Sequence, residues 1–157
     1  MESQLMILAQ NLEQKLEALR KIQEYNRRQA EIFTAGKVDI NHFDVAMEEK
    51  QRLIDELIHL DEDFELLYKK LAGELKDNRQ QYASQIRTLQ AKVAEVMELS
   101  ASVRIQEEQN RKRFGDYFGK ERTALGQRRK NARNAFDYYK SMSGAGYIPP
   151  QMYDNKQ

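Results

Sequence analysis

The chain has 157 residues, of which 26 are basic and 25 acidic, so its formal net charge is only +1. Seven glycines and two prolines are few for this length, and the bias toward Glu, Lys, Arg, Gln, Leu and Ala is typical of long helices. The absence of cysteine excludes disulfides, thiolate metal sites and cysteine nucleophiles. Two histidines are too few for a zinc centre built on several imidazoles.

The hydropathy of the chain gives no sign of a membrane protein. No apolar run approaches the roughly 20 residues that a membrane-spanning helix needs. The first residues lack the basic-then-apolar order of a signal peptide. We therefore expect a soluble cytoplasmic protein with no stable membrane insertion.

Charge and aromatic residues divide the chain into two parts. Residues 1–103 carry 14 basic and 19 acidic side chains, whereas residues 104–142 carry 11 basic and 5 acidic ones. Eight of the fourteen phenylalanines and tyrosines lie after residue 113. An acidic body is therefore followed by a basic, aromatic-rich end, and this division is the first indication of function.

The first predicted helix covers residues 3–34. Its apolar residues recur three or four positions apart, which is the spacing of one helix face. Gly36 is a candidate for a left-handed stop after this helix, and Asp39 is a candidate N-cap for the next one. The apolar positions are Leu5, Leu8, Leu12, Leu16, Leu19, Ile22, Tyr25, Ile32 and Phe33.

The second predicted helix covers residues 39–75 and ends at a turn near Gly73 or residues 76–78. Its apolar spacing alternates between three and four, as in a coiled coil, if Lys50 and Asp61 are counted as polar interruptions. The apolar positions are Ile40, Phe43, Met47, Ile54, Leu57, Phe64, Tyr68, Leu71 and Leu75.

The third predicted helix begins with residues 79–113. After residue 103 its seam becomes polar, and Glu107 and Asn110 continue the register of the apolar positions. Those apolar positions are Tyr82, Ile86, Leu89, Val93, Val96 and Val103.

Three segments of similar length, each with one apolar stripe, predict the fold. About 35 residues at 1.5 Å per residue make a helix about 50 Å long. Short connections make neighbouring helices antiparallel. We expect an all-α protein, an elongated antiparallel three-helix bundle or coiled coil whose long third helix extends past the bundle. The alternative is a long helical hairpin that forms a homodimer through its first helix.

The chain after residue 113 is predicted to bind a partner. We divide the protein into a coiled-coil body (residues 1–113), a basic amphipathic helix (114–142) and a flexible tail (143–157). Three glycines weaken the basic helix by roughly 1 kcal/mol each relative to alanine. Its apolar stripe has nothing to pack on beyond the two shorter helices, and such a stripe usually marks a partner site. The stripe consists of Phe114, Phe118, Leu125, Ala132 and Tyr139, with Phe136 beside it.

Two structural alternatives exist for this stripe, namely self-dimerisation and folding back onto the bundle. The tail that follows contains two glycines and two prolines, so it cannot continue the helix. Its large apolar residues are Tyr147, Ile148, Met152 and Tyr153.

Enzymatic functions find little support in the sequence. No glycine-rich phosphate loop follows a strand. His42 and His59 are seventeen residues apart on one predicted helix, which puts them about 25 Å apart, too far to share a metal ion. The acidic cluster Asp61, Glu62, Asp63 and Glu65 has no EF-hand glycine turn, so we expect it to face water. We predict no catalytic residue, no metal and no cofactor.

Clustered basic residues in the third helix leave two further alternatives open. Arg111, Lys112 and Arg113, then Arg128, Arg129 and Lys130, could contact nucleic acid or an anionic membrane surface. The acidic body would repel a duplex and the whole chain is nearly neutral, so neither reading is preferred. A non-enzymatic coiled-coil scaffold or adaptor is the remaining alternative.

The second and third helices resemble a known family. The segment FDVAMEEKQRLIDELIHLDEDFELLYKKL is similar to the middle part of FlgN-type flagellar export chaperones, through Lys50, Leu53, Ile54, Leu57, Leu60, Asp61 and Phe64. The stretch from IRTLQAKVAEVMEL to IQEEQNRKRF resembles the long helix of that family, through Glu107, Glu108 and Asn110. The ending NAFDYYKSM, followed by MYDNKQ, is also similar.

The resemblance implies a specific function and specific partners. Family members are cytoplasmic chaperones that bind hook-associated junction proteins of the FlgK and FlgL type, keep them from assembling early and deliver them to the type III export gate. By position, the client-binding residues would be Phe114, Tyr117, Phe118, Leu125, Phe136 and Tyr139. The tyrosine that docks to the cytoplasmic domain of the gate membrane protein would be Tyr138, Tyr139, Tyr147 or Tyr153.

Overall fold

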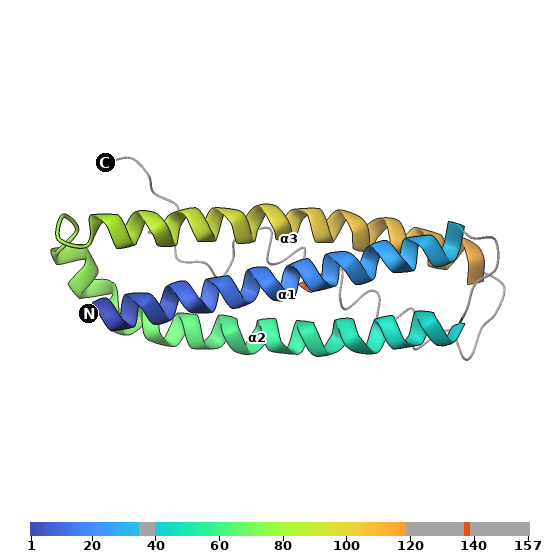
Figure 1. Ribbon diagram of the computed structural model, residues 1–157, viewed down its shortest axis with the longest axis horizontal. Helices are drawn as coiled ribbons and strands as arrows, with labels where there is room; N and C mark the ends of the chain where they lie inside the picture. Colours follow the sequence, from blue (N-terminus) through green and yellow to red (C-terminus); the bar gives the residue numbers. More distant parts are fainter. Residues whose placement is uncertain (35–39, 119–136, 139–157) are drawn as a thin grey trace.

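The computed structural model describes residues 1–34, 40–118 and 137–138 of the chain. Three long helices make up almost all of these residues: α1 (Glu2–Thr34), α2 (Ile40–Asp77) and α3 (Ala83–Phe118). They lie side by side along one long axis, with α2 antiparallel to α1 and α3 (Figure 1). The expected all-α, elongated antiparallel three-helix bundle is confirmed.

The core is the seam that the apolar spacing predicted. The inward position recurs every three or four residues along each helix. It is mostly occupied by leucine, isoleucine, valine or an aromatic residue, and these side chains form one continuous cluster. Its most buried members come from all three helices: Leu8, Leu19, Ile22, Leu57, Leu89, Val93, Val96 and Val103.

Helix α1 lies between the other two helices and contacts both (Figure 1). Among the described residues, no Cα atom of α2 comes within 8 Å of a Cα atom of α3. Helices α2 and α3 therefore meet only through long side chains, such as the rings of Phe43 and Phe114. Helices α2 and α3 are thus farther from each other than either is from α1.

Polar contacts show a fixed register along the whole bundle. Contacts between α1 and α3 join residues 79 to 84 positions apart, as parallel helices in constant register require. Between α1 and α2 the separation falls from 49 positions at Asn11 to 21 at Gln29, as antiparallel helices require. The α1–α3 contacts are Glu13–Lys92, Gln23–Ser102, Asn26–Gln106 and Asn26–Asn110.

The turn between α2 and α3 begins at the later of the two predicted places, residues 76–78. Gly73 lies within α2, where an added Cβ would meet no atom within 4 Å, so this glycine ends nothing. Asn78 instead closes the helix, because its backbone N–H and its side-chain amide both donate to the carbonyl oxygen of Glu74, at 3.0 and 2.9 Å. The candidate stop Gly36 and the candidate cap Asp39 lie outside the described residues.

Helix α3 continues through the expected boundary at residue 113 and is described as far as Phe118. The side chain of Phe114 is only 2 % exposed and packs on Phe43, at the first turn of α2. The expectation that the stripe from residue 114 onward lacks a packing partner is therefore wrong at Phe114. It failed because α3 ends level with the start of α2, so its last turns still have neighbours (Figure 1). The predicted extension beyond the bundle falls on residues 119–136, outside the described part.

None of the described helices is long and apolar enough to span a membrane.

Substitution of Leu57 tests the seam. Its side chain is fully buried, so Leu57→Ala is expected to lower the free energy of unfolding by about 2–5 kcal/mol through lost contacts and a cavity. Leu66 lies on the same helix and is 64 % exposed. Leu66→Ala should change the free energy of unfolding by less than about 0.5 kcal/mol. Urea denaturation of both variants measures the difference, and equal losses would show that α2 is packed by another face.

Candidate functional site

An aromatic cluster closes the end of the bundle where α1 ends and α2 begins. The ring of Phe43 stacks on Phe114 with centroids 5.3 Å apart and meets Phe33 edge-on at 5.7 Å. Tyr117, in the last turn of α3, lies 6.2 Å from Phe33 and is 51 % exposed. All three helices thus contribute one ring or more, and Tyr117 presents part of this cluster to solvent.

The structure separates the expected client-binding residues into different roles. Phe114 is a core residue, and Tyr117 is the half-exposed ring beside it. Phe118 is the last residue of α3, and its side chain lies outside the described part. The other expected residues also lie outside the described part of the chain: Leu125, Phe136, Tyr139, Tyr147 and Tyr153.

Tyr138 lies far from the aromatic cluster, against the middle of the bundle. Its hydroxyl donates a hydrogen bond to Oδ2 of Asp61 on α2, at 3.0 Å, and its ring packs against the main core. Burial, followed by the negative charge of Asp61, raises the pKa of the Tyr138 phenol well above its ordinary value. The hydroxyl therefore stays protonated and remains a donor.

Asp61 also forms an ion pair with Lys15 of α1. The ammonium nitrogen of Lys15 lies 2.5 Å from Oδ1 of Asp61, and the two side chains are 2 % and 14 % exposed. Burial lowers the pKa of Lys15, and the charge and hydrogen bond of Asp61 oppose that shift. The expectation that Asp61 faces water is wrong, because its position is an inward one in the alternating spacing of α2 between Leu57 and Phe64.

Lys15 was not among the residues singled out from the sequence. The signal was present, since Lys15 falls three residues after Leu12 and four before Leu19 in the alternating spacing of α1. A lysine at an inward position needs a carboxylate opposite it. Asp61 occupies the matching inward position of the antiparallel helix.

A second buried ion pair joins α2 to α3. Nζ of Lys50 lies 2.6 Å from Oε1 of Glu107, and each side chain is only 2 % exposed. The same ammonium group donates to Oε1 of Gln29 on α1 at 2.9 Å. Lys50 of α2 therefore connects all three helices, because it contacts Glu107 of α3 and Gln29 of α1. The predicted polar interruption of the seam is thus a contact between helices.

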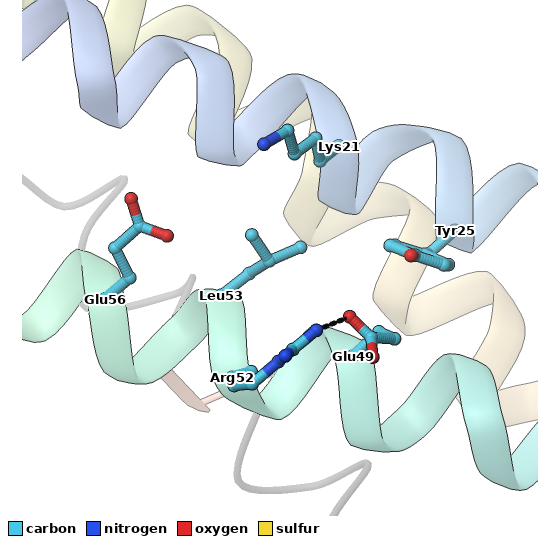
Figure 2. Close-up of a pocket in the computed structure, with 6 residues that line it drawn as sticks. All are labelled: Lys21, Tyr25, Glu49, Arg52, Leu53 and Glu56. Carbon is cyan, nitrogen blue, oxygen red and sulfur yellow. Dashed lines mark hydrogen bonds and ion pairs between the residues drawn. The ribbon is translucent and has the colours of Figure 1, made fainter.

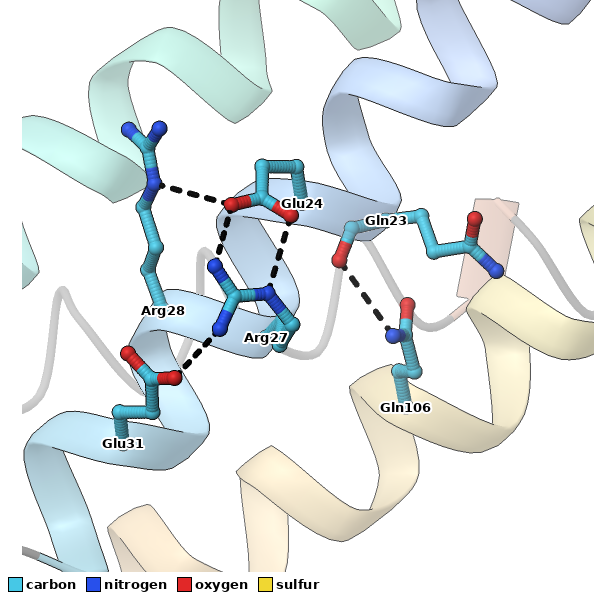
Figure 3. Close-up of polar contacts among 6 residues, drawn as sticks. All are labelled: Gln23, Glu24, Arg27, Arg28, Glu31 and Gln106. Carbon is cyan, nitrogen blue, oxygen red and sulfur yellow. Dashed lines mark hydrogen bonds and ion pairs between the residues drawn. The ribbon is translucent and has the colours of Figure 1, made fainter.

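Amide side chains continue this polar region toward the aromatic end. Asn110 of α3 donates to the carbonyl oxygen of Asn26 at 2.9 Å, and Gln106 donates to that of Gln23 at 3.3 Å (Figure 3). On the outer face of α1, Arg27 pairs with Glu24 and Glu31 within the helix (Figure 3). The hydrogen bond from Arg27 lowers the pKa of Glu24.

A shallow hollow of about 450 Å³ lies on the surface between α1 and α2 (Figure 2). Arg52 on the rim of the hollow forms an ion pair with the neighbouring Glu49. The other residues that line the hollow carry charges of both signs. The lining residues are Lys21, Tyr25, Glu49, Arg52, Leu53 and Glu56. This arrangement lacks a buried polar group that would select a ligand.

Within the described residues, no group of three or more His, Asp or Glu side chains is arranged to hold a metal ion. His42 and His59 are exposed, as expected.

Comparison of the chain with protein-family models, with curated proteins and with solved structures found no match.

The buried pair Lys50–Glu107 should respond to mutation differently from a surface pair. Glu107→Leu leaves the Lys50 ammonium buried without its carboxylate and should cost about 3–5 kcal/mol of stability. The exposed pair Lys69–Glu65 provides the control, and Glu65→Leu should cost less than about 1 kcal/mol.

The double variant Lys50→Met with Glu107→Leu should recover most of that loss, because it removes both buried charges together. Denaturant unfolding of these three variants and of the unchanged protein decides the matter. A Glu107→Leu loss no larger than that of Glu65→Leu would mean that the pair is not buried in solution.

The pKa of Tyr138 makes a prediction about alkaline pH. The folded chain keeps a phenol proton that the unfolded chain releases near pH 10, so this contribution to stability is present below about pH 10 and is lost as the pH rises above it. In the folded protein, Tyr138→Phe should leave the phenolate absorbance at 295 nm near pH 11 unchanged. A decrease in this absorbance equal to the contribution of one of the eight tyrosines would show that Tyr138 titrates normally.

Proposed function

We propose that this protein is a cytoplasmic chaperone of flagellar type III export, which binds hook-associated junction proteins of the FlgK and FlgL type and delivers them to the export gate. In this proposal it acts by binding alone, without catalytic residues or a cofactor. The client would contact the aromatic residues of the C-terminal third, and a tyrosine of that region would dock to the cytoplasmic domain of the gate membrane protein.

One observation carries the proposal. Four of the five polar residues through which α2 and α3 resemble FlgN-type chaperones pair the helices: Lys50 with Glu107, Asp61 with Lys15, and Asn110 with Asn26. The likeness therefore rests on residues that determine how the bundle assembles, and goes beyond a shared amphipathic pattern.

The described part of the chain also suits a binding protein. Its core is confined to a long narrow bundle, and Tyr117 leaves half of an aromatic ring exposed where α3 ends. Aromatic side chains of this kind anchor helical segments of partner proteins. The contact of Tyr138 with Asp61 places this C-terminal residue beside the body. A client bound near Tyr138 would therefore also lie close to the body.

Capture of a purified hook-associated junction protein by the full chain tests the proposal. The triple variant Leu125→Ala, Phe136→Ala and Tyr139→Ala should weaken binding at least tenfold, because buried aromatic and aliphatic anchors contribute most of such affinities. A matched triple variant removes exposed apolar side chains from the body instead: Ile7→Ala, Leu66→Ala and Ile105→Ala. It should bind as the unchanged protein does.

Two outcomes would reject this function. The first is no binding by the unchanged chain. The second is equal weakening by both triple variants, which would favour a general coiled-coil scaffold. Titration of salt is the companion measurement: client binding through apolar contacts should change little between 50 and 200 mM, whereas binding of DNA or RNA would fall steeply.

A further inference from the structure

After α3 the chain returns to the bundle at a point far from where α3 ends. Phe114 lies beside Phe43 at the start of α2, whereas Tyr138 contacts Asp61, eighteen residues further along α2. Eighteen residues of helix span about 27 Å. Tyr138 therefore contacts the body about 27 Å from the aromatic cluster, measured along α2.

The contact at Asp61 is chemically specific. Each carboxylate oxygen of Asp61 has its own partner, since Oδ1 lies 2.5 Å from the Lys15 ammonium and Oδ2 accepts the Tyr138 hydroxyl at 3.0 Å. Phenylalanine in place of Tyr138 would have no hydrogen to donate to a carboxylate that is only 14 % exposed. A tyrosine is thus selected over other rings.

The position of Asp61 in the seam explains why this contact forms at that place. The ring of Tyr138 packs against the main hydrophobic core cluster, which is formed by the seam residues of the three helices. Asp61 is the inward carboxylate of that seam, so the phenol meets an acceptor at the point where its ring is buried.

We propose that the Tyr138–Asp61 contact is an intramolecular latch, which holds the segment around Tyr138 against the body and competes with partner binding by that segment. The occupant of the site is Tyr138 of the same chain. The identity of the competing partner, a hook-associated junction protein, rests on the proposed function, whereas the latch itself does not.

The latch has the strength that a reversible switch needs. A hydrogen bond to a charged acceptor changes an equilibrium by about 10- to 100-fold. Chains in which the Tyr138–Asp61 contact is broken, the open form, are then a minor population. A partner of micromolar affinity can still bind to them. Closure would reduce the apparent affinity for the partner to the intrinsic affinity multiplied by the fraction of chains that are open.

Spin labels on the full chain measure the latch in the absence of any partner. The chain has no cysteine, so Asp63→Cys on α2 and Asp137→Cys provide two unique labelling positions, both exposed. We expect a dominant short distance between the labels. Tyr138→Phe should lower the ratio of closed to open chains about tenfold or more, and the control Tyr25→Phe should leave it unchanged.

A second pair of variants changes the acceptor instead of the tyrosine. Lys15→Met with Asp61→Leu removes the buried pair together with the acceptor of Tyr138 and should open the latch. Lys50→Met with Glu107→Leu removes the other buried pair and should leave the label distance unchanged. Thermal melts of both confirm that the bundle is folded during the measurement.

Three results would overturn the latch: no short distance in the unchanged chain, no response to either Tyr138→Phe or the Asp61 variant, or equal opening by both double variants. A short distance that disappears when labelled chains are diluted with unlabelled chains would assign the contact to a second copy and reject the intramolecular form.

The competition is measured with the purified junction protein of the proposed function. Binding should abolish the short label distance, and Lys15→Met with Asp61→Leu should lower the apparent Kd about tenfold. Binding that leaves the short distance intact rejects the competition. If the junction protein binds no variant, the proposed function and the competition both fail, while the label distances still decide whether the latch exists.

Discussion

The pairing of the three helices depends on two lysine ammonium groups that are buried against carboxylates. A seam of leucine and valine alone tolerates a shift of one helix by a heptad, because apolar side chains meet apolar side chains after the shift. In this bundle such a shift would leave Lys15, Asp61, Lys50 and Glu107 among aliphatic groups without their partners. Each unpaired buried ion costs several kcal/mol, so the ion pairs exclude the alternative registers.

The position of α1 between the other helices has a consequence for function. Lys15 joins α1 to α2, and Lys50 joins α2 to α3 while also bonding Gln29 of α1. Helices α2 and α3 are consequently held at a distance that only long side chains bridge. Asp61 of α2 also accepts the hydroxyl of Tyr138, so a polar group of the core is available to a residue that follows the bundle in the sequence.

The alternation of apolar positions was enough to predict three helices, their approximate bounds and their antiparallel order. It also placed Lys50, Asp61, Glu107 and Asn110 in the seam. It could not show that these polar residues are partners, because the register between two helices depends on the length of the turn that joins them. The sequence offered two turn signals, Gly73 and residues 76–78, and α2 passes the first and ends at the second, at Asp77. An exposed helical glycine near a helix end costs little, so the neighbouring Asn78 decided the boundary.

The candidate site was less accessible to sequence reasoning. Phe114 and Tyr117 belong to one aromatic series on the same side of α3, but Tyr117 lies nearly one turn closer to the helix end, so Phe114 is in the core and Tyr117 is half in solvent. The hydrogen bond of Tyr138 to Asp61 joins residues 77 positions apart, and no local pattern encodes a contact of that range. Lys15 was overlooked because a single lysine within a leucine-rich helix is usually a surface residue.

Reversal of the Lys50–Glu107 pair tests the central claim most directly, namely that buried charge pairs fix the register of the bundle. Lys50→Glu and Glu107→Lys each bring two like charges together in the core and should each cost more than about 3 kcal/mol. The exchanged pair Lys50→Glu with Glu107→Lys restores opposite charges at the same positions. A thermodynamic cycle from denaturant unfolding should therefore give a favourable coupling of at least about 2 kcal/mol. A double variant as unstable as the sum of its single variants would contradict the account.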